Sequence, residues 1–213
     1  MSNIVKFENA NLPSTEVLAQ ALGNLVAGQQ DTGVTILKMD KTGHWVFGAD
    51  QTEVERDSVW AINPVSFVYG YIAWGDGEVL GEKMVSIFQP LPELDVAPPN
   101  AKKGWELQYG MMLQCTSGED AGINAKFMTT SVGGKKSLQQ LASSVAVQAK
   151  ADPDKIVAMV RLSTEHYQHK SYGKIYTPMF DLVSWASMNG ETEAPAEAAP
   201  EPAPAGRRRR AIA

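Results

Sequence analysis

The sequence predicts an α+β fold built mostly of antiparallel β-strands, arranged as a curved sheet or a small barrel with one main helix. Short runs of β-branched and aromatic residues recur over residues 34–131, separated by turns that contain glycine and aspartate. A helical spacing of apolar residues dominates residues 137–149, and two more strand-like runs follow. This order differs from the regular alternation of strands and helices that builds parallel sheets.

The first elements are a short helix and a hairpin. Over residues 15–26, three apolar residues recur at every fourth position behind a serine or threonine cap, which predicts an amphipathic helix. Residues 34–39 and 44–47 are expected to form the two arms of a hairpin, because residues 40–43 have the composition of a turn.

The middle of the chain continues the strand pattern. Strands are expected over residues 58–62 and 65–74, and the tight turn at residues 75–77 leads to a partner strand over 79–88. Four prolines make residues 89–100 an irregular crossing rather than the interior of an element.

Two further strands, over residues 104–115 and 125–131, precede the main helix. That helix is predicted over residues 137–149 and ends before the Asp152-Pro153 pair. The last strands are expected over 156–162 and 175–185.

Pro178 places the last strand at a sheet edge or a bulge. Residues 1–190 are therefore expected to form a single globular β-rich domain. From residue 191 the sequence reduces to Ala, Pro, Glu and Gly before four arginines, which predicts a disordered tail over 191–213. The tail either only keeps the chain soluble or contacts phosphate or a protein partner through Arg207 to Arg210.

Composition and missing motifs argue against several classes of protein. Cys115 is the single cysteine, so one chain can form no disulfide and no cysteine zinc cluster, and we expect Cys115 to pack as a small apolar residue. No apolar run approaches the roughly 18 residues of a membrane span, so no membrane contact and a cytoplasmic location are expected. The common nucleophile and dinucleotide motifs are also absent, so we expect no enzyme and no cofactor.

Charge is sorted along this chain. Residues 1–125 carry seven basic and sixteen acidic residues, whereas residues 126–174 carry eight basic and three acidic residues, in a protein of net charge -5. Because exposed charges act over about 8 Å at physiological salt, a local basic surface can bind phosphate on an acidic molecule.

Two glycines and two lysines lie at the start of the main helix. Gly133 and Gly134 are expected in the turn between a strand and the helix, followed by Lys135 and Lys136. Such a turn can bring backbone N–H groups and cations to a phosphate, although plain turn chemistry also explains the glycines. The Walker A pattern is absent, because position 129 is Thr instead of Gly.

Rings and cations alternate near residue 170. This pattern is typical of surfaces that stack unpaired bases and neutralise phosphates; its residues are Tyr167, His169, Lys170, Tyr172, Lys174 and Tyr176. The alternative is that the tyrosines cover the core while the lysines protect a sheet edge from aggregation.

Two histidines and one tryptophan are further candidates. His166 and His169 are three residues apart, which turns them to opposite faces of a strand and argues against a metal site. Trp74 precedes a tight turn, where it could be exposed as a further stacking platform, whereas the other tryptophans fit the core better.

Several strings of residues resemble uncharacterised proteins of tailed bacteriophages and prophages, over most of residues 55–188. They are Ile62-Asn63-Pro64, Gly70 to Trp74, Gly81 to Lys83, Thr130 to Gly134 and Tyr172 to Pro178. More loosely, the β-rich body and the Pro- and Ala-rich tail are similar to phage single-stranded DNA-binding proteins of the OB-fold kind. This resemblance implies an OB-like barrel and the cytoplasm of a bacterial host. The arginine-rich end differs from the acidic end usual in such proteins.

The sequence therefore predicts a non-catalytic protein that binds single-stranded nucleic acid, DNA more than RNA, during phage replication or recombination. The alternative is a phage structural or accessory protein whose rings and edge strands meet another protein or a second copy of the chain. A homo-oligomer fits either prediction.

Overall fold

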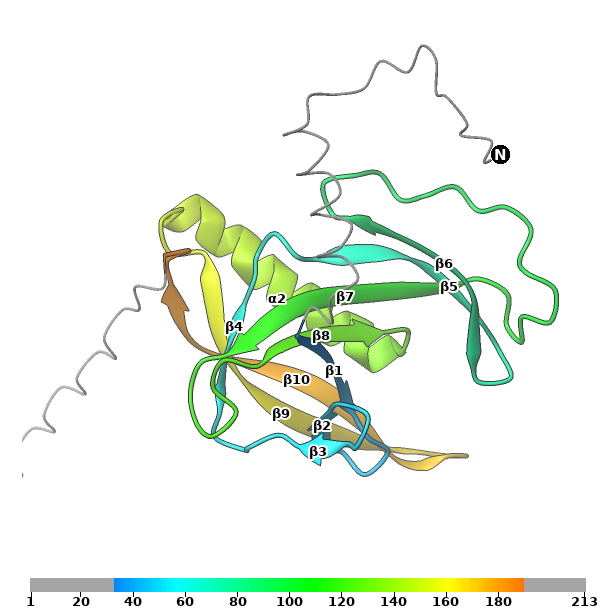
Figure 1. Cartoon of the computed structure of the whole chain (residues 1–213), viewed down its shortest axis with the longest axis horizontal. Helices are drawn as coiled ribbons and strands as arrows, with labels where there is room; N and C mark the ends of the chain where they lie inside the picture. Colours follow the sequence, from blue (N-terminus) through cyan, green and yellow to red (C-terminus); the bar gives the residue numbers. More distant parts are fainter. Residues whose placement is uncertain (1–32, 190–213) are drawn as a thin grey trace, which may run out of the picture.

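The computed structural model describes residues 33–189 (Figure 1). Within that range one mixed, largely antiparallel sheet of ten strands is joined by one helix, and the sheet is open. The structure therefore confirms a mostly β fold with one main helix. The predicted helix over 15–26 and the predicted tail over 191–213 lie outside the described residues.

The elements over residues 33–189 follow the predicted order, with a short strand at Thr52–Glu53 as an addition. They are β1 (Val34–Met39), β2 (Trp45–Phe47), β3 (Thr52–Glu53), β4 (Val59–Ile62), β5 (Val68–Gly75), β6 (Glu78–Ser86), β7 (Glu106–Cys115), β8 (Asn124–Thr129), α2 (Val132–Ala151), β9 (Val157–His169) and β10 (Gly173–Ala186). The main path of the sheet is β10-β9-β4-β7-β8-β1-β2-β3. One half of β7 pairs with β4, and its other half pairs with β5, which in turn carries β6.

Turn chemistry explains the β1–β2 hairpin. The carboxylate of Asp40 accepts hydrogen bonds from the backbone N–H groups of Thr42 and His44 and from the Thr42 hydroxyl. The backbone bond from His44, followed by the side-chain bond from Thr42, lowers the pKa of Asp40. Gly43 completes the turn at φ 90°, a conformation that favours glycine.

The core lies between the curved sheet and α2. Trp45, Phe127 and Phe180 form a cluster with ring centroids 5.4 to 5.5 Å apart. Leu138 and Leu141 bring one side of α2 into the same core. Cys115 is 1% exposed and packs there as predicted, and burial raises the pKa of its thiol.

The two ends of the sheet curve toward each other. The indole Nε1 of Trp45 in β2 donates to the carbonyl of Ser163 in β9 at 2.8 Å. The hydroxyl of Thr164 donates to the carbonyl of Gly43, also at 2.8 Å. These are isolated contacts with no ladder between β2 and β9, so the sheet bends like a barrel while remaining open.

Strand pairing differs from expectation at β1. β1 pairs with β8 in parallel, with Val34 opposite Asn124 and Leu37 opposite Phe127. The two strands are far apart in the sequence, and apolar residues at alternate positions, such as Leu37 and Phe127, face the same core. A local pattern does not specify the direction of such a pair.

The last two strands are longer than predicted. β9 continues to His169 and β10 begins at Gly173, so the hairpin extends through residues 163–174, between the two predicted strands. The outer part of this hairpin is mainly exposed on both faces, so it needs no alternation of apolar and polar residues. β10 is an edge strand of the sheet, which confirms the position expected for Pro178.

The β5–β6 hairpin forms an arm to one side of the curved sheet (Figure 1). The Pro-rich segment over 89–100 is irregular, as predicted. It packs back on the arm through an ion pair of 2.8 Å between Lys83 and Asp95, and through a bond from Trp105 Nε1 to the Asp95 carbonyl. Lys83 is the main cause of the lowered pKa of Asp95.

Candidate nucleic-acid interface

The end of the β9–β10 hairpin carries most of the predicted site residues. β9 ends at His169 and β10 begins at Gly173, with Lys170 and Tyr172 in the turn between them. Figure 1 shows this hairpin projecting beyond the rest of the sheet. Tyr172 is 78% exposed, and Tyr167 in β9 is 53% exposed.

A local contact orders the turn. The Nδ1 atom of His169 accepts hydrogen bonds from the backbone N–H groups of Ser171 and Tyr172, at 3.1 and 3.2 Å. The rings of His169 and Tyr172 lie 4.8 Å apart at an interplanar angle of 32°. The imidazole thus supports one side of the Tyr172 ring, and the exposed remainder of that ring is open to a stacking partner.

The hairpin divides the predicted residues between its two faces. Tyr167 is opposite Ile175, whereas His166 is opposite Tyr176. Residues that pair directly across antiparallel strands share a face, and neighbours along a strand point to opposite faces. Tyr167 therefore lies on the other face from Tyr176 and Lys174.

Tyr176 has a packing role. Its ring covers Gly43, where an added Cβ would overlap the ring atoms. The ring centroid lies 5.9 Å from that of His166, and the Nζ atom of Lys174 lies 4.7 Å from it. Tyr176 is only half-buried, but these neighbours leave it less free to stack on a base than Tyr167 or Tyr172.

The glycines near Lys135 differ in position from the prediction. α2 begins at Val132, so Gly133 and Gly134 occupy its first turn instead of a turn before it. Gly133 lies against Thr177 of β10, where a Cβ would be 2.8 Å from the threonine Oγ1. Both glycines have ordinary helical backbone conformations. Their role is therefore steric, because the absence of side chains allows α2 to pack closely on its neighbours.

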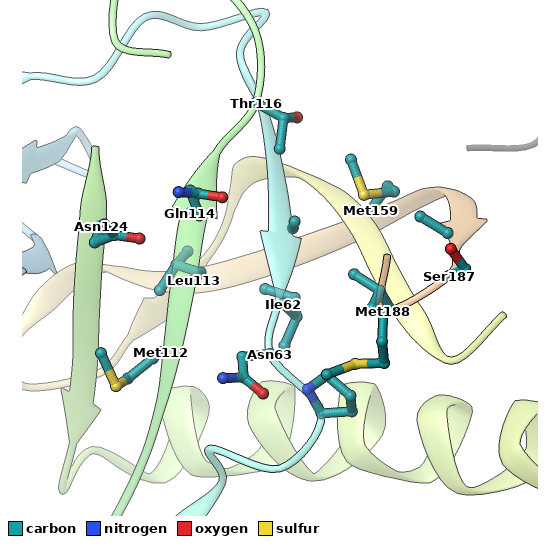
Figure 2. A pocket seen from close by; sticks show the side chains of 14 residues that line it. Ile62, Asn63, Met112, Leu113, Gln114, Thr116, Asn124, Met159, Ser187 and Met188 are labelled. Atoms are coloured by element: carbon teal, nitrogen blue, oxygen red, sulfur yellow. The ribbon is translucent and has the colours of Figure 1, made fainter. Parts of the chain in front are cut away.

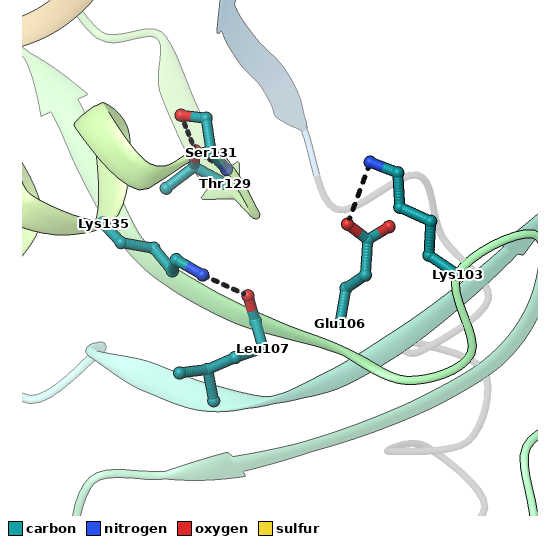
Figure 3. A network of polar contacts seen from close by, with 6 residues as sticks. All are labelled: Lys103, Glu106, Leu107, Thr129, Ser131 and Lys135. Atoms are coloured by element: carbon teal, nitrogen blue, oxygen red, sulfur yellow. Dashed lines mark hydrogen bonds and ion pairs between the residues drawn. The ribbon is translucent and has the colours of Figure 1, made fainter.

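The two lysines that follow have different surroundings. The Nζ atom of Lys135 is held 3.3 Å from the carbonyl of Leu107, to which it donates (Figure 3). Lys136 is exposed. Thr177 is opposite Glu165, so the start of α2 packs on the hairpin face that also carries Tyr167. The start of α2 and the exposed ring of Tyr167 therefore lie on the same side of the hairpin.

Trp74 belongs to a different part of the molecule. It lies near the end of β5 and is 38% exposed, which confirms its predicted exposure at the end of a hairpin. That hairpin is the β5–β6 arm rather than β9–β10. Trp74 is therefore not part of the cluster formed by Tyr167, His169, Lys170 and Tyr172.

Sequence reasoning missed a groove on the outer face of the sheet. Ala61 of β4 is one of its lining residues. Others are Gln114 of β7, Asn124 of β8 and Met188 after β10 (Figure 2). The groove has a volume of about 560 Å³. The alternation of buried and exposed residues in β7 and β8 places Gln114 and Asn124 outward, and this signal was present in the sequence.

Within residues 33–189, no three His, Cys, Asp or Glu side chains gather where they could hold a metal ion. No helix in that range is both long and apolar enough to cross a membrane.

Comparisons with known proteins find no family model, no curated protein and no solved structure that matches this chain.

Proposed function

We propose that this chain is a non-catalytic single-stranded DNA-binding protein of a phage or prophage, acting in replication or recombination in the host cytoplasm. The observation that carries the proposal is the projecting end of the β9–β10 hairpin, where Tyr167, Lys170 and Tyr172 are exposed, with the exposed Lys174 on the opposite face from Tyr167. Stacking on an aromatic ring contributes about 1 to 3 kcal/mol per base and tolerates any base. Two such rings suit a strand read without sequence preference.

The position of α2 supports a path for the phosphates. Its first turn packs on the hairpin face of Tyr167, and the exposed Lys136 follows Gly133 by about one helical turn. Unpaired N–H groups and cations at a helix start favour anions. A strand whose bases stack on Tyr167 therefore has a favourable site for a phosphate near Lys136.

The strand order supports an OB-type barrel as the finer description of the fold. Along the path β9-β4-β7-β8-β1, the β8–β1 pair is parallel and the helix lies between β8 and β9. An OB-fold has the same spatial order of strands. The difference is that its fifth strand comes last in the sequence, whereas the corresponding strand here, β1, comes first. The contacts of Trp45 and Gly43 with β9 bring the ends together, as in a partly open barrel.

The experiment is a fluorescence anisotropy titration of a labelled oligothymidine of about 15 nucleotides at two ionic strengths. We expect binding that weakens as salt increases, because cations on the protein replace the counterions of the phosphates.

Tyr172→Ala should weaken binding about 5-fold or more, since one stacked base is lost. Lys103→Ala, which removes an exposed lysine just before β7 that pairs with Glu106, is the control and should change little. Absence of binding at low salt contradicts the proposal.

A second candidate, a phage structural or accessory protein, is favoured by a different surface. Apolar side chains are exposed on β6 and on the segment that follows it, including Phe88 at 72% and Val96 at 93%. Exposed apolar groups gathered in one region are typical of protein interfaces. Light scattering separates the candidates, because a multimer that is insensitive to salt and has no affinity for oligonucleotides favours this one.

A further inference from the structure

The outer groove exists because a small residue stands between larger ones. Ala61 of β4 is opposite Gln114 on one side and opposite Met159 on the other. All three point to the outer face, since Trp60 and Ile62 on either side of Ala61 face the core. The short alanine side chain leaves a hollow between its neighbours, which Figure 2 shows from close by.

The lining of the groove carries no charge. Its fourteen residues include three methionines, three carboxamides and two hydroxyl groups, and none is Asp, Glu, Lys, Arg or His; the methionines are Met112, Met159 and Met188. Gln114 and Asn124 are directly opposite each other on β7 and β8, and both are exposed. Their carboxamides therefore lie on one face and together offer donors and acceptors.

Cations flank the neutral groove on two sides. Lys126 is opposite Met112 and shares its outward face on β8. Arg161 lies two residues beyond Met159 on the same face of β9, directly opposite Val59 on one side and the acidic Asp181 of β10 on the other. Both cations are exposed and lie outside the lining. Lys126 is paired across its strand only with apolar residues, whereas the exposed Asp181 offsets the charge of Arg161.

We propose that this groove binds one unpaired nucleobase, with an adjoining phosphate at Lys126. An uncharged hollow offers no ion pair to a phosphate or carboxylate. A base is planar and neutral, and its edges carry hydrogen-bond donors and acceptors. Methionine thioethers contact aromatic rings favourably, and Asn and Gln carboxamides pair well with adenine edges. The volume of about 560 Å³ lies within the range of small-molecule sites.

This inference rests on the proposed function for its biological meaning, and it adds a base preference that the hairpin rings do not provide. Stacking on Tyr167 or Tyr172 accepts any base, while the paired carboxamides of Gln114 and Asn124 favour adenine. We therefore expect a strand to bind at both places, with adenine preferred at the groove.

The first test uses a probe without phosphate. The full chain, labelled with ¹³C at its methionine methyl groups, is titrated with adenosine and followed by NMR. We expect the signals of Met112 and Met188 to shift in a saturable way that is insensitive to salt, with assignments from Met→Leu variants. Met84, which lies in β6 away from the groove, is the internal control. No shift at the groove methionines, or equal shifts at all methionines, overturns the proposal.

The second test compares oligoadenine with oligothymidine of equal length by anisotropy. Gln114→Leu combined with Asn124→Leu keeps the side chains close in size and removes both carboxamides. We expect the wild-type protein to prefer oligoadenine about 5-fold or more, and this variant to bind the two oligonucleotides equally. Both positions are exposed, so the variant should fold, which far-UV circular dichroism checks.

The outcomes separate this inference from the proposed function. If oligonucleotides bind and Tyr172→Ala weakens them, but adenosine leaves the groove methionines unchanged, the groove inference is wrong and the proposed function stands. If no oligonucleotide binds at low salt, the proposed function is wrong, and the adenosine titration still decides whether the groove accepts a base.

Discussion

At the scale of single residues, Ser131 determines where α2 begins. Its side chain accepts a hydrogen bond from the backbone N–H of Gly134 at 3.0 Å, and its backbone is extended, as an N-cap requires. The predicted helix began at residue 137 because glycines are poor helix formers. In the structure, the cap and the close contacts of Gly133 and Gly134 outweigh that propensity.

We predict that Ser131→Ala lowers the free energy of unfolding by about 1 kcal/mol, because an N–H at the helix start loses its partner. Ser131→Asp should retain most of the stability, since aspartate also caps helices. Ser144→Ala is the matched control. Ser144 lies on an exposed part of α2, where its hydroxyl bonds back to the Gln140 carbonyl, so its loss should be neutral or slightly stabilising. Equal losses for Ser131→Ala and Ser144→Ala in urea unfolding would contradict a capping role.

At the scale of elements, the packing of the β1–β2 turn on β10 connects the two ends of the sheet. Gly43 and Gly77 both adopt a φ of 90° in hairpin turns. A Cβ at Gly43 would overlap the Tyr176 ring, whereas a Cβ at Gly77 would meet nothing within 4 Å. The two glycines therefore have the same backbone requirement and different surroundings.

This pair allows a direct measurement of the turn contact. We predict that Gly77→Ala costs about 1 to 2 kcal/mol, from backbone strain alone. Gly43→Ala should cost a further ~1 to 3 kcal/mol, because the added methyl group displaces Tyr176. Thermal unfolding of the two variants measures the difference. Equal costs would mean that the Tyr176 ring moves aside freely and that the contact contributes little to the curvature of the sheet.

The length of the β9–β10 hairpin determines how far the candidate site residues lie from the core. Because the ladder continues to His169 and Gly173, the rings extend beyond the packed part of the sheet. The same regular pairing sends Tyr167 and Tyr176 to opposite faces. A strand that follows one face of the hairpin therefore meets Tyr167 and the start of α2, with Tyr172 at the end of the hairpin.

At the scale of the whole molecule, one sheet connects the elements over residues 33–189. The β5–β6 arm joins the remainder through the β5–β7 ladder, and β7 also pairs with β4 and β8. Shared strands of this kind couple the folding of neighbouring parts.

We predict that urea unfolding followed by tryptophan fluorescence and by far-UV circular dichroism gives coincident transitions. Trp60 reports on the core, and Trp74 reports on the arm. Trp74→Phe is the control, because it removes one of the two tryptophans at the arm, the other being Trp105, which packs on Gly81 and Lys83. An early fluorescence phase whose amplitude falls in Trp74→Phe would show that the arm unfolds separately.

The sequence by itself determined the features that depend on neighbouring residues. Turn residues such as Asp40 to Gly43 and Gly75 to Gly77 predicted the hairpins, and prolines predicted the irregular segment over 89–100. These features follow from the conformations that each residue allows, so a short window contains the necessary information.

Only the tertiary structure decided which distant segments meet. The parallel pairing of β1 with β8, the packing of α2 on the face of Tyr167, and the hollow above Ala61 each depend on residues far apart in the chain. The same holds for Tyr176, whose ring is engaged by Gly43. Such contacts are selected by the burial of apolar surface in one common core, and no local pattern encodes that choice.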